Sequence, residues 1–396
     1  MIRPNILVTG ATGKLGRLIV HQLLAAGWPV RALVRRHDPR SSALQQAGAE
    51  LALGDLTDPE SLTLAMRGVQ RALFLPAFSP YMTHMAVAFS VAARTARLES
   101  LVSLSQWLAA PSHPSFATHQ HWLADRLLGS LPGIAHTVVN PGFFADNVLR
   151  TLQYAAHLGV LPWLYGNGRN APPSNEDIAA VAAHALMTPE RHAGRSYRPT
   201  GPQLLSPDEI VQTIARVVGH RVVKVPLPFW MFIKAARLDG ATIDELMPYR
   251  AYIEDYRAGA FELGAPNDDV LEVTGRAAED FETIARRYAA LPAALPTLAN
   301  RMRTMATFMA IPFRRGYDLE GYARALKEPQ ALNAEPAVHS SSWRRERGLP
   351  QRDGSPVRPE SRMHASLGPR SEPASGFLGS WPGRNIDEAA MKETLR

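Results

Sequence analysis

The sequence predicts an α/β protein with a doubly wound parallel sheet, followed by a smaller C-terminal α/β lobe and a tail that is mostly disordered. Three observations lead to this prediction. Short apolar runs alternate with amphipathic stretches as far as about residue 143, which is typical of parallel strands buried between two layers of helices. A glycine-rich turn follows the first apolar run. From residue 329 onward Pro, Gly, Ser and Arg dominate, and large apolar residues are few.

Three evenly spaced glycines join the first strand, residues 6–8, to an amphipathic helix. Gly10 allows a tight turn, Gly13 leaves room for a pyrophosphate, and Gly16 allows the helix to pack closely on the strand. The N–H groups and the dipole at the start of the helix then favour phosphate. The alternative is a turn without a ligand, but the order strand, turn, helix favours a dinucleotide site. The expected contacts are Gly10, Thr12, Gly13, Lys14, Leu15 and Gly16.

The second strand, residues 30–36, ends in two arginines where an NAD-specific site carries an acidic residue. A guanidinium suits the 2′-phosphate of NADP, which a carboxylate would repel. We therefore expect Arg35 to bind this phosphate, and NADPH to be preferred over NADH. Asp38 can instead serve the ribose, and Lys14 can add a second cation near the phosphate. A solvated surface charge is the alternative for both residues.

Four more strands are expected, at residues 49–56, 72–76, 101–105 and 136–142. Their carboxyl ends meet at one edge of the sheet, where doubly wound sheets bind their ligands. The contacts expected along this edge are Leu75, Pro76, Ser103, Pro141 and Gly142. Ser103 and Ser105 can bond cofactor or substrate, or can have only a capping role. Phe143, Phe144 and Asn147 follow on the substrate side, and ordinary core is the alternative for the two phenylalanines.

The sequence divides into four stretches: a dinucleotide-binding part at 1–150, a smaller substrate lobe interleaved with it at 151–291, a helical extension at 292–328 and the tail at 329–396. In the lobe, helices at 175–186 and 206–218 begin with capping-box spacing. In the extension, four apolar residues at helical spacing predict core packing, with a membrane or partner surface as the alternative. They are Leu298, Met302, Met305 and Met309. In the tail, an anchor at Trp343 and a short helix at 386–395 are the exceptions to disorder.

Composition excludes several classes of protein. The chain has no cysteine, so disulfides, thiolate metal sites and thiol nucleophiles are excluded. The net charge of +7 resides mostly in the C-terminal region without an aromatic-interleaved basic face, and we expect no nucleic-acid partner. The first strand begins after four residues, and no apolar run reaches the ~18 residues of a membrane span. We therefore expect a cytoplasmic protein with no signal peptide that acts on a small molecule.

Several motifs together resemble the NmrA-like branch of the atypical short-chain dehydrogenases. They are Gly10-Ala-Thr-Gly-x-x-Gly16, Val34-Arg35, Gly54-Asp55-Leu56, Asn140-Pro-Gly-Phe-Phe-x-x-Asn147, Asp177-Ile-Ala and Val273-Thr-Gly-Arg276. The resemblance extends over about residues 2–288. It implies a Rossmann-like fold with NAD(P) in the crevice and with Asp55 and Leu56 near the adenine. The family includes reductases of quinones and other small molecules, and also regulators that bind the cofactor without turnover.

The residues that protonate the substrate elsewhere in this superfamily are missing. There a Tyr-x-x-x-Lys pair delivers the proton, and no tyrosine of this chain has a lysine four residues later. His121 stands where many NmrA-like proteins have a lysine, and Asp125 follows one helical turn later. The two can relay a proton near neutral pH or can only hold the helix on the sheet. We expect no metal, because His119, His121 and Asp125 lack the spacing of a metal site.

Two functions fit these residues. The first is an NADPH-dependent oxidoreductase that passes hydride to a small acceptor such as a quinone, with the proton coming from water or His121 and with Ser103 as a second candidate catalytic residue. The second is a non-catalytic NAD(P)-sensing regulatory protein whose Arg-rich tail is available to a partner. We favour the oxidoreductase, because most cofactor sites of this type serve chemistry.

Overall fold

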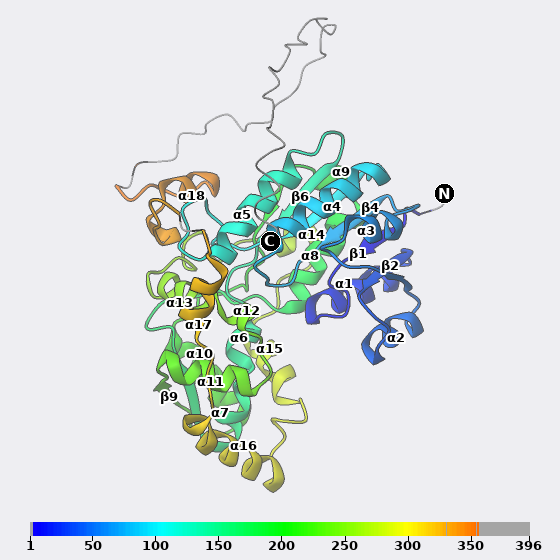
Figure 1. The fold of residues 1–396 in the computed structure, drawn as a ribbon. Helices are drawn as coiled ribbons and strands as arrows, with labels where there is room; N and C mark the ends of the chain where they lie inside the picture. The colour runs from blue at the N-terminus through cyan, green and yellow to red at the C-terminus, as the bar shows by residue number, and fades with distance from the viewer. Residues whose placement is uncertain (1–2, 330, 354, 356–396) are drawn as a thin grey trace, which may run out of the picture. The chain divides into compact units, whose positions relative to one another are not determined.

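The structure, a computed structural model, describes residues 3–329, 331–353 and 355. Its centre is a seven-stranded parallel sheet with the order β3-β2-β1-β4-β5-β6-β8 (Figure 1). The predicted doubly wound parallel sheet is therefore confirmed. Strands β7 and β9 form a second, two-stranded sheet that the sequence analysis did not predict, as it did not predict the two-residue β8. The strands are β1 (Ile6–Val8), β2 (Val30–Val34), β3 (Glu50–Leu53), β4 (Arg71–Phe74), β5 (Ser100–Leu104), β6 (Ala135–Val139), β7 (Val160–Trp163), β8 (Ser196–Tyr197) and β9 (Val223–Pro226).

Most helices of the described residues begin at a polar capping residue or a proline, as their sequences indicate. Asp38 and Asp58, for example, each accept two N–H bonds at the starts of α2 and α3. The helices are α1 (Lys14–Ala25), α2 (Pro39–Gln46), α3 (Pro59–Ala65), α4 (Met82–Ala96), α5 (Phe116–Gly129), α6 (Ala145–Leu149), α7 (Leu152–Leu158), α8 (Asn175–Met187), α9 (Pro189–His192), α10 (Pro207–Val218), α11 (Phe229–Leu238), α12 (Ile243–Leu246), α13 (Tyr249–Arg257), α14 (Asp269–Thr274), α15 (Phe281–Ala289), α16 (Leu298–Ala310), η1 (Ile311–Phe313), α17 (Leu319–Leu326), η2 (Ala337–His339) and α18 (Ser341–Glu346).

Alternate side chains of β1 contribute to the hydrophobic cores on the two faces of the sheet. Ile6 and Val8 are buried in the core that includes α1 and α8, whereas Leu7 belongs to the opposite core with α3, α4 and α5. Successive residues of a strand face opposite sides of the sheet, so one apolar tripeptide contributes to two cores. With helices on both faces, the carboxyl ends of the parallel strands share one edge, and the candidate site lies there.

Helix α8 packs against the large sheet beside α1, although the sequence analysis placed this helix in the smaller lobe. It packs on α1, with Ile178, Ala182 and other small or branched side chains in their shared core. Alanines at most of the buried positions of α8 let it approach α1 closely. The helix therefore packs with the first part of the chain, although it comes later in the sequence. Ser174 caps it as predicted by accepting the N–H of Asp177. The Asp177 carboxylate does not complete the capping box, because it accepts the N–H of Glu279 at 2.9 Å and pairs with Arg276 at 2.6 Å.

The second part of the chain forms its own core around aromatic side chains. The centroid of the Phe143 ring lies 4.7 Å from the ring centroid of Tyr165, 5.0 Å from that of Tyr256 and 5.7 Å from that of Phe261. The alternative considered for Phe143, ordinary core, is thus the correct one. In the same part, the helix predicted at 206–218 is α10, and its capping box between Ser206 and Glu209 is formed.

Residues 335–349 pack on the rest of the chain, around the position where the sequence analysis expects an anchor in a mostly disordered tail. The expected anchor, Trp343, is completely buried. The N–H of Ala337 donates to the buried carboxylate of Asp255 at 2.8 Å. Average composition does not register single anchoring contacts of this kind. The short helix expected at 386–395 lies outside the described residues.

The apolar stripe of α16 is not part of the core, so that prediction is wrong. The exposed fractions of Leu298, Met302 and Met309 are 75%, 64% and 62%. The helix packs instead through its opposite face, which includes the buried Thr304 and the ring of Phe308 near Tyr154. Helical spacing marks a stripe but not the side on which the helix is covered. Among the described helices, none has the length and apolarity needed to cross a bilayer.

Candidate nucleotide and acceptor site

The glycine turn after β1 is shaped by close backbone contacts. Gly10 has φ +62°, and a Cβ there would lie 2.8 Å from the carbonyl oxygen of Leu75. A Cβ on Gly16 would lie 2.2 Å from the carbonyl oxygen of Gly10. The N–H of Gly13 donates to this same oxygen at 2.9 Å and closes the turn. Gly10 and Gly16 are therefore required by packing, as the sequence predicts.

The start of α1 is open to a ligand. Gly13 is the N-cap residue in extended conformation and offers no side-chain acceptor to the first-turn N–H groups of Lys14, Leu15 and Gly16. A Cβ on Gly13 would meet only the carbonyl oxygen of Gly10, at 3.2 Å. The side chain of Leu15 is buried, so only its N–H can face a ligand. Uncapped N–H groups beside a position that a side chain would fill suit the diphosphate of a dinucleotide.

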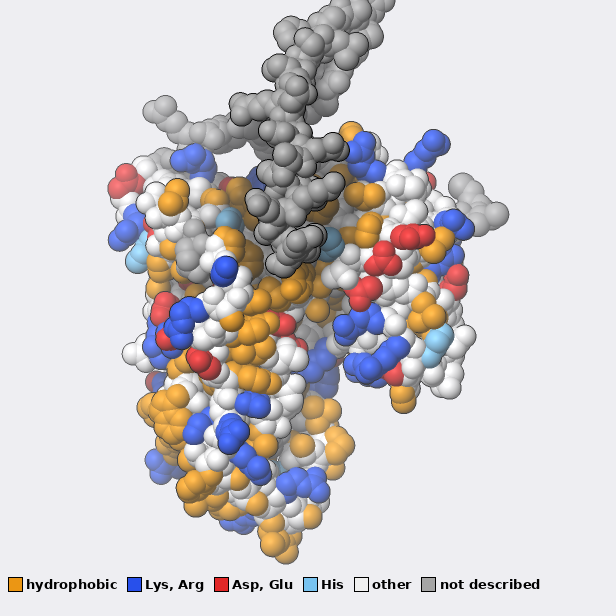
Figure 2. All heavy atoms as spheres, viewed as in Figure 1, with side chains coloured by type: hydrophobic (Ala, Val, Ile, Leu, Met, Phe, Trp, Pro, Cys, Tyr) orange, Lys and Arg blue, Asp and Glu red, His pale blue; other side chains and the backbone are white. Residues whose placement is uncertain are grey.

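At the end of β2, Arg35 and Arg36 are both exposed. Asp38 is engaged elsewhere, since its carboxylate accepts the N–H groups of Arg40 and Ser41 and pairs with the Arg40 guanidinium at 2.7 Å. This capping role leaves little of Asp38 for a ribose and favours the predicted role of Arg35. Figure 2 shows Lys and Arg side chains gathered over the α2 side of a hollow that separates this part from the part with α10 and α11.

Asp55 and Leu56 follow β3 and are half-buried. The Asp55 carboxylate accepts the N–H and the hydroxyl of Thr57 at 2.8 and 2.7 Å. The N–H bond from Thr57 is the main cause that lowers the pKa of Asp55, and the positive charge of Arg35 adds to it. Arg35 and the Asp55 loop are thus close enough to interact electrostatically, at the strand ends where the sequence analysis expects the adenosine.

Lys14 is bonded differently from the prediction. Its ammonium lies 3.0 Å from the carboxylate of Asp146 in α6, a partner that the sequence analysis did not consider. Asp146 also pairs with Arg150 at 2.9 Å and accepts the hydroxyl of Tyr288 at 2.6 Å. Desolvation raises the pKa of Asp146, but Arg150, Tyr288 and Lys14 outweigh it and hold the pKa below its usual value. The sequence analysis missed Asp146, because nothing local marks a carboxylate whose partners come from residues 14 and 288.

The ends of β4 and β6 lie at the same edge of the sheet as the glycine turn. Leu75 follows β4, and its N–H donates to the hydroxyl of Thr9 at 2.8 Å, which holds the β4 exit with the half-buried Pro76 against the turn. Pro141 and Gly142 follow β6 and are buried. A Cβ on Gly142 would contact Arg198 and Phe261 at 3.4 Å, so the β6 exit packs on the second part of the chain. The strand ends lie at one edge as predicted, and their contacts to a cofactor stay predictions.

Ser103 and Ser105 face the helix layer and belong to a buried polar cluster. The Ser103 hydroxyl donates to Asp125 at 3.2 Å and lies 2.9 Å from Nε2 of His136, and the Ser105 hydroxyl bonds the same carboxylate. Desolvation raises the pKa of Asp125 to about 6, although both serine hydroxyls oppose the shift. Burial lowers the pKa of His136 to about 4. In this structure the two serines bond Asp125 of α5 and His136 of β6, rather than capping the strand or facing an open site. The sequence does not reveal these partners.

The expected pair of His121 and Asp125 is not formed. Asp125 turns to Ser103 in β5 and to Ser105 just after it, so the one-turn spacing on α5 brings no bond between His121 and Asp125. His121 is only 7% exposed and meets the ring of Phe78 edge-on, with 6.1 Å between ring centroids. Burial lowers the pKa of His121 to about 4. At neutral pH its imidazole is therefore uncharged, and the bond to Asp125 through which the pair would relay a proton is not formed.

Comparisons with known proteins show which proteins the chain resembles. The family model for the NmrA-like family matches residues 3–90. The chain is 32% identical to the NAD(P)H azoreductase of Xenophilus azovorans over 292 residues, which is 72% of this chain and 98% of that protein. It is 24% identical to quinone oxidoreductase 2 of Escherichia coli over 219 residues, 55% of this chain and 76% of that protein.

Solved structures share the fold at low sequence identity. An NADPH-dependent quinone oxidoreductase from Escherichia coli, complexed with NADPH, superposes with a TM-score of 0.61 at 22% identity, covering 71% of this chain and 99% of that one. The triphenylmethane reductase of Citrobacter sp., complexed with NADP(H), has a TM-score of 0.61 at 24% identity, covering 72% and 99%. These likenesses concern the fold, and each leaves more than a quarter of the present chain without a counterpart.

Proposed function

The chain belongs to the NmrA-like family, and from this premise we propose that it is an NADPH-dependent oxidoreductase of a small acceptor such as a quinone. The observation that carries the proposal is the glycine turn. Its two packed glycines flank the uncapped start of α1, where Gly13 leaves space for a diphosphate. A relative named for its NAD(P)H-dependent azoreductase activity aligns along 98% of its length, which supports the same assignment.

Each end of the dinucleotide is assigned to residues of this chain. The first-turn N–H groups, together with Gly10 and Thr12, hold the diphosphate, and the exposed Arg35 binds the 2′-phosphate. Asp55 and Leu56 lie beside the adenine. Leu75, Pro76, Pro141 and Gly142 border the nicotinamide, and when bound the nicotinamide ring supplies the hydride for the acceptor. The cofactor preference for NADP rests on Arg35 and on the engagement of Asp38 in capping α2.

The acceptor class follows from the proton chemistry available. A quinone accepts hydride directly and takes its proton from water, so it does not need a Tyr–Lys pair. The Ser103 hydroxyl is held between Asp125 and His136, and the uncharged His121 has a pKa of about 4. Neither residue delivers a proton efficiently near pH 7. We assign His121 to the wall of the acceptor side, with Phe78 as its neighbour.

The glycine turn, together with the missing proton donor, also supports a second candidate function, the non-catalytic cofactor sensor. A site that binds NADPH without a proton donor of suitable pKa is what a sensor requires, because turnover would deplete the signal. The two functions differ in one measurable respect, which is whether the bound coenzyme is consumed when an acceptor is present.

The deciding experiment uses the purified full chain with NADPH or NADH. Calorimetry measures binding, and absorbance measures steady coenzyme consumption against a panel of quinones, azo dyes and triphenylmethane dyes. We expect binding of NADPH and turnover with at least one acceptor. Binding without turnover on the whole panel would overturn the oxidoreductase and leave the sensor. Absence of binding to either coenzyme would overturn both. Gly13→Ala provides the background rate, because its methyl group occupies the space assigned to the diphosphate.

A further inference from the structure

Helix α16 and η1 present a bare apolar stripe to solvent. Met305 is 46% exposed and Phe313 is 88% exposed, in addition to the three residues of the stripe described above. We call this surface the α16 stripe. Its members, spaced by three or four residues, are Leu298, Met302, Met305, Met309 and Phe313. Figure 2 shows hydrophobic side chains gathered at the lower end of the molecule, where Figure 1 places α16.

The helix is held firmly by its other face, so the stripe is not exposed through loose packing. Thr304 and Ile311 are buried, and the ring of Phe308 lies 5.9 Å from that of Tyr154 in α7. From α11, Lys234 donates to the carbonyl oxygen of Pro312 at 2.6 Å. Within the part of the chain that the structure describes, the most apolar side of this ordered helix is left uncovered, and folding alone does not explain this arrangement.

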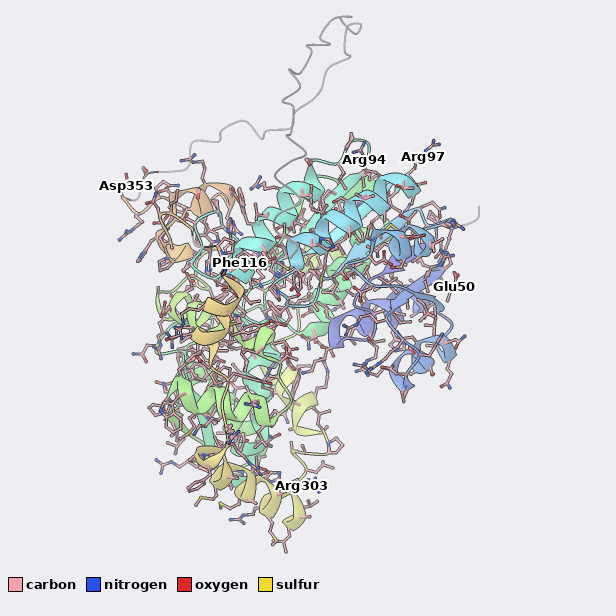
Figure 3. All side chains as sticks on the ribbon, viewed as in Figure 1. Glu50, Arg94, Arg97, Phe116, Arg303 and Asp353 are labelled. Carbon is pink, nitrogen blue, oxygen red and sulfur yellow. The ribbon has the colours of Figure 1, made fainter. Side chains whose placement is uncertain are left out.

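The charges within the segment that carries the stripe have one sign. Between residues 291 and 317 the sequence has four arginines and neither Asp nor Glu. The arginines are Arg301, Arg303, Arg314 and Arg315, and all four are exposed. Figure 3 labels Arg303 at the lower end of the molecule, on α16. On the adjoining α11, Trp230 is 53% exposed with the Lys234 ammonium 5.0 Å from its ring.

We propose that the α16 stripe docks the protein on an anionic lipid bilayer, with α16 lying in the plane of the interface. Apolar side chains with arginines beside them and an exposed tryptophan are what such a surface binds. Anionic headgroups complement the arginines, and each basic residue near the surface adds to the attraction. A second copy of the chain fits poorly, because its stripe would bring the same positive charges face to face. The proposal does not depend on the proposed oxidoreductase activity.

The experiment is co-sedimentation of the full chain with phosphatidylcholine vesicles that contain or lack phosphatidylglycerol. We expect binding to the anionic vesicles that weakens with added salt, and little binding to pure phosphatidylcholine. The double variant Met305→Ser/Met309→Ser should bind at least tenfold more weakly. Its matched control is Val87→Ser/Val91→Ser on α4, which removes two side chains that are 47% and 51% exposed at the same spacing and should bind as the parent does.

The contribution of charge is tested separately by Arg301→Gln/Arg303→Gln. We expect weaker binding to anionic vesicles and a smaller dependence on salt. Circular dichroism of each variant checks that it is folded, which the exposure of these side chains favours. Equal binding of the methionine double variant and the parent would overturn the proposal, as would failure of the parent to sediment with anionic vesicles. Stripe-dependent dimerisation without lipid, seen by analytical ultracentrifugation, would also overturn it and assign the surface to a second copy.

Discussion

The indole N–H of Trp343 donates to the main-chain carbonyl oxygen of Trp107 at 2.7 Å, across 236 residues of sequence. The two rings meet edge to face with their centroids 5.4 Å apart. Arg347 lies over both rings, at 5.1 Å from Trp107 and 5.2 Å from Trp343, and donates to the carbonyl oxygen of Ala109 at 2.9 Å. The C-terminal segment is thereby fastened to the loop that leaves β5, next to the edge where we place the cofactor.

Replacing Trp343 should therefore destabilise the protein, and by more for alanine than for phenylalanine. Trp343→Phe keeps a ring but leaves the Trp107 carbonyl without its partner, which should cost about 1–2 kcal/mol. Trp343→Ala also removes a completely buried side chain and should cost about 3–5 kcal/mol. Urea unfolding measures the loss, and limited proteolysis should show early cleavage near residues 335–349. Trp230→Ala, on the surface, should change stability by less than about 1 kcal/mol. Parent-like resistance of Trp343→Ala to protease would show that the segment is not fastened there.

Two glycines of the same turn should respond differently to alanine. Gly16→Ala places a methyl group 2.2 Å from the Gly10 carbonyl oxygen, so the turn must shift and stability should fall by about 2 kcal/mol or more. Gly13→Ala meets only one oxygen, at 3.2 Å, so it should fold nearly as stably as the parent. It should nevertheless weaken NADPH binding at least tenfold, because its methyl group fills the space for the diphosphate. Thermal unfolding and calorimetry separate the effects, and undiminished binding by Gly13→Ala would contradict our placement of the diphosphate.

Coenzyme preference should depend on Arg35 and not on its neighbour. Arg35→Ala should weaken NADPH binding by about tenfold to a hundredfold while changing NADH binding little, since only NADPH carries the 2′-phosphate. Arg36 lies 3.9 Å from Asp38, and Arg36→Ala serves as the matched control. Calorimetric titration of each variant with both coenzymes measures the ratio. If NADPH and NADH binding fall equally in Arg35→Ala, the 2′-phosphate is held elsewhere.

Stability should decline on acidification because of buried histidines. The pKa of His121 and that of His136 are lowered from 6.5 to about 4, so the unfolded chain binds more protons between these pH values. For His121, which is 7% exposed, the loss is on the order of 3 kcal/mol between pH 6.5 and pH 4. Asp125 acts in the opposite direction, because its pKa is raised from 3.8 to about 6 and the folded chain binds the extra proton in that range.

These opposite signs give a test with two variants. Urea unfolding across pH 4 to 7 should show a shallower decline for His121→Asn, which removes a group that gains a proton on unfolding. The decline should be steeper for Asp125→Asn, which removes the opposing group but keeps an amide that can bond Ser103 and Ser105. Identical slopes for the parent and His121→Asn would show that His121 is not held uncharged in the folded chain.

Features that depend on neighbouring residues could be predicted from the sequence, whereas contacts between residues far apart in the sequence could not. The strands around Ile6 and Leu101, the turn at Gly10 and the capping box at Ser206 depend on neighbours within a few residues, and these predictions were correct. The spacing of one helical turn on α5 indicates that Asp125 can pair with His121. The structure pairs Asp125 with Ser103 and Ser105 instead, since β5 lies under that face of the helix.

What the sequence by itself determined is the parallel sheet and the glycine turn at the head of α1, because strand patterning and turn chemistry are encoded locally. What only the tertiary structure decided is which surfaces meet. It fastened the segment around the expected anchor Trp343 to the loop after β5, joined Asp177 to Arg276, and left Met302 and Met309 exposed. A periodic pattern tells which side chains share a face, but the element packed opposite decides whether that face is covered.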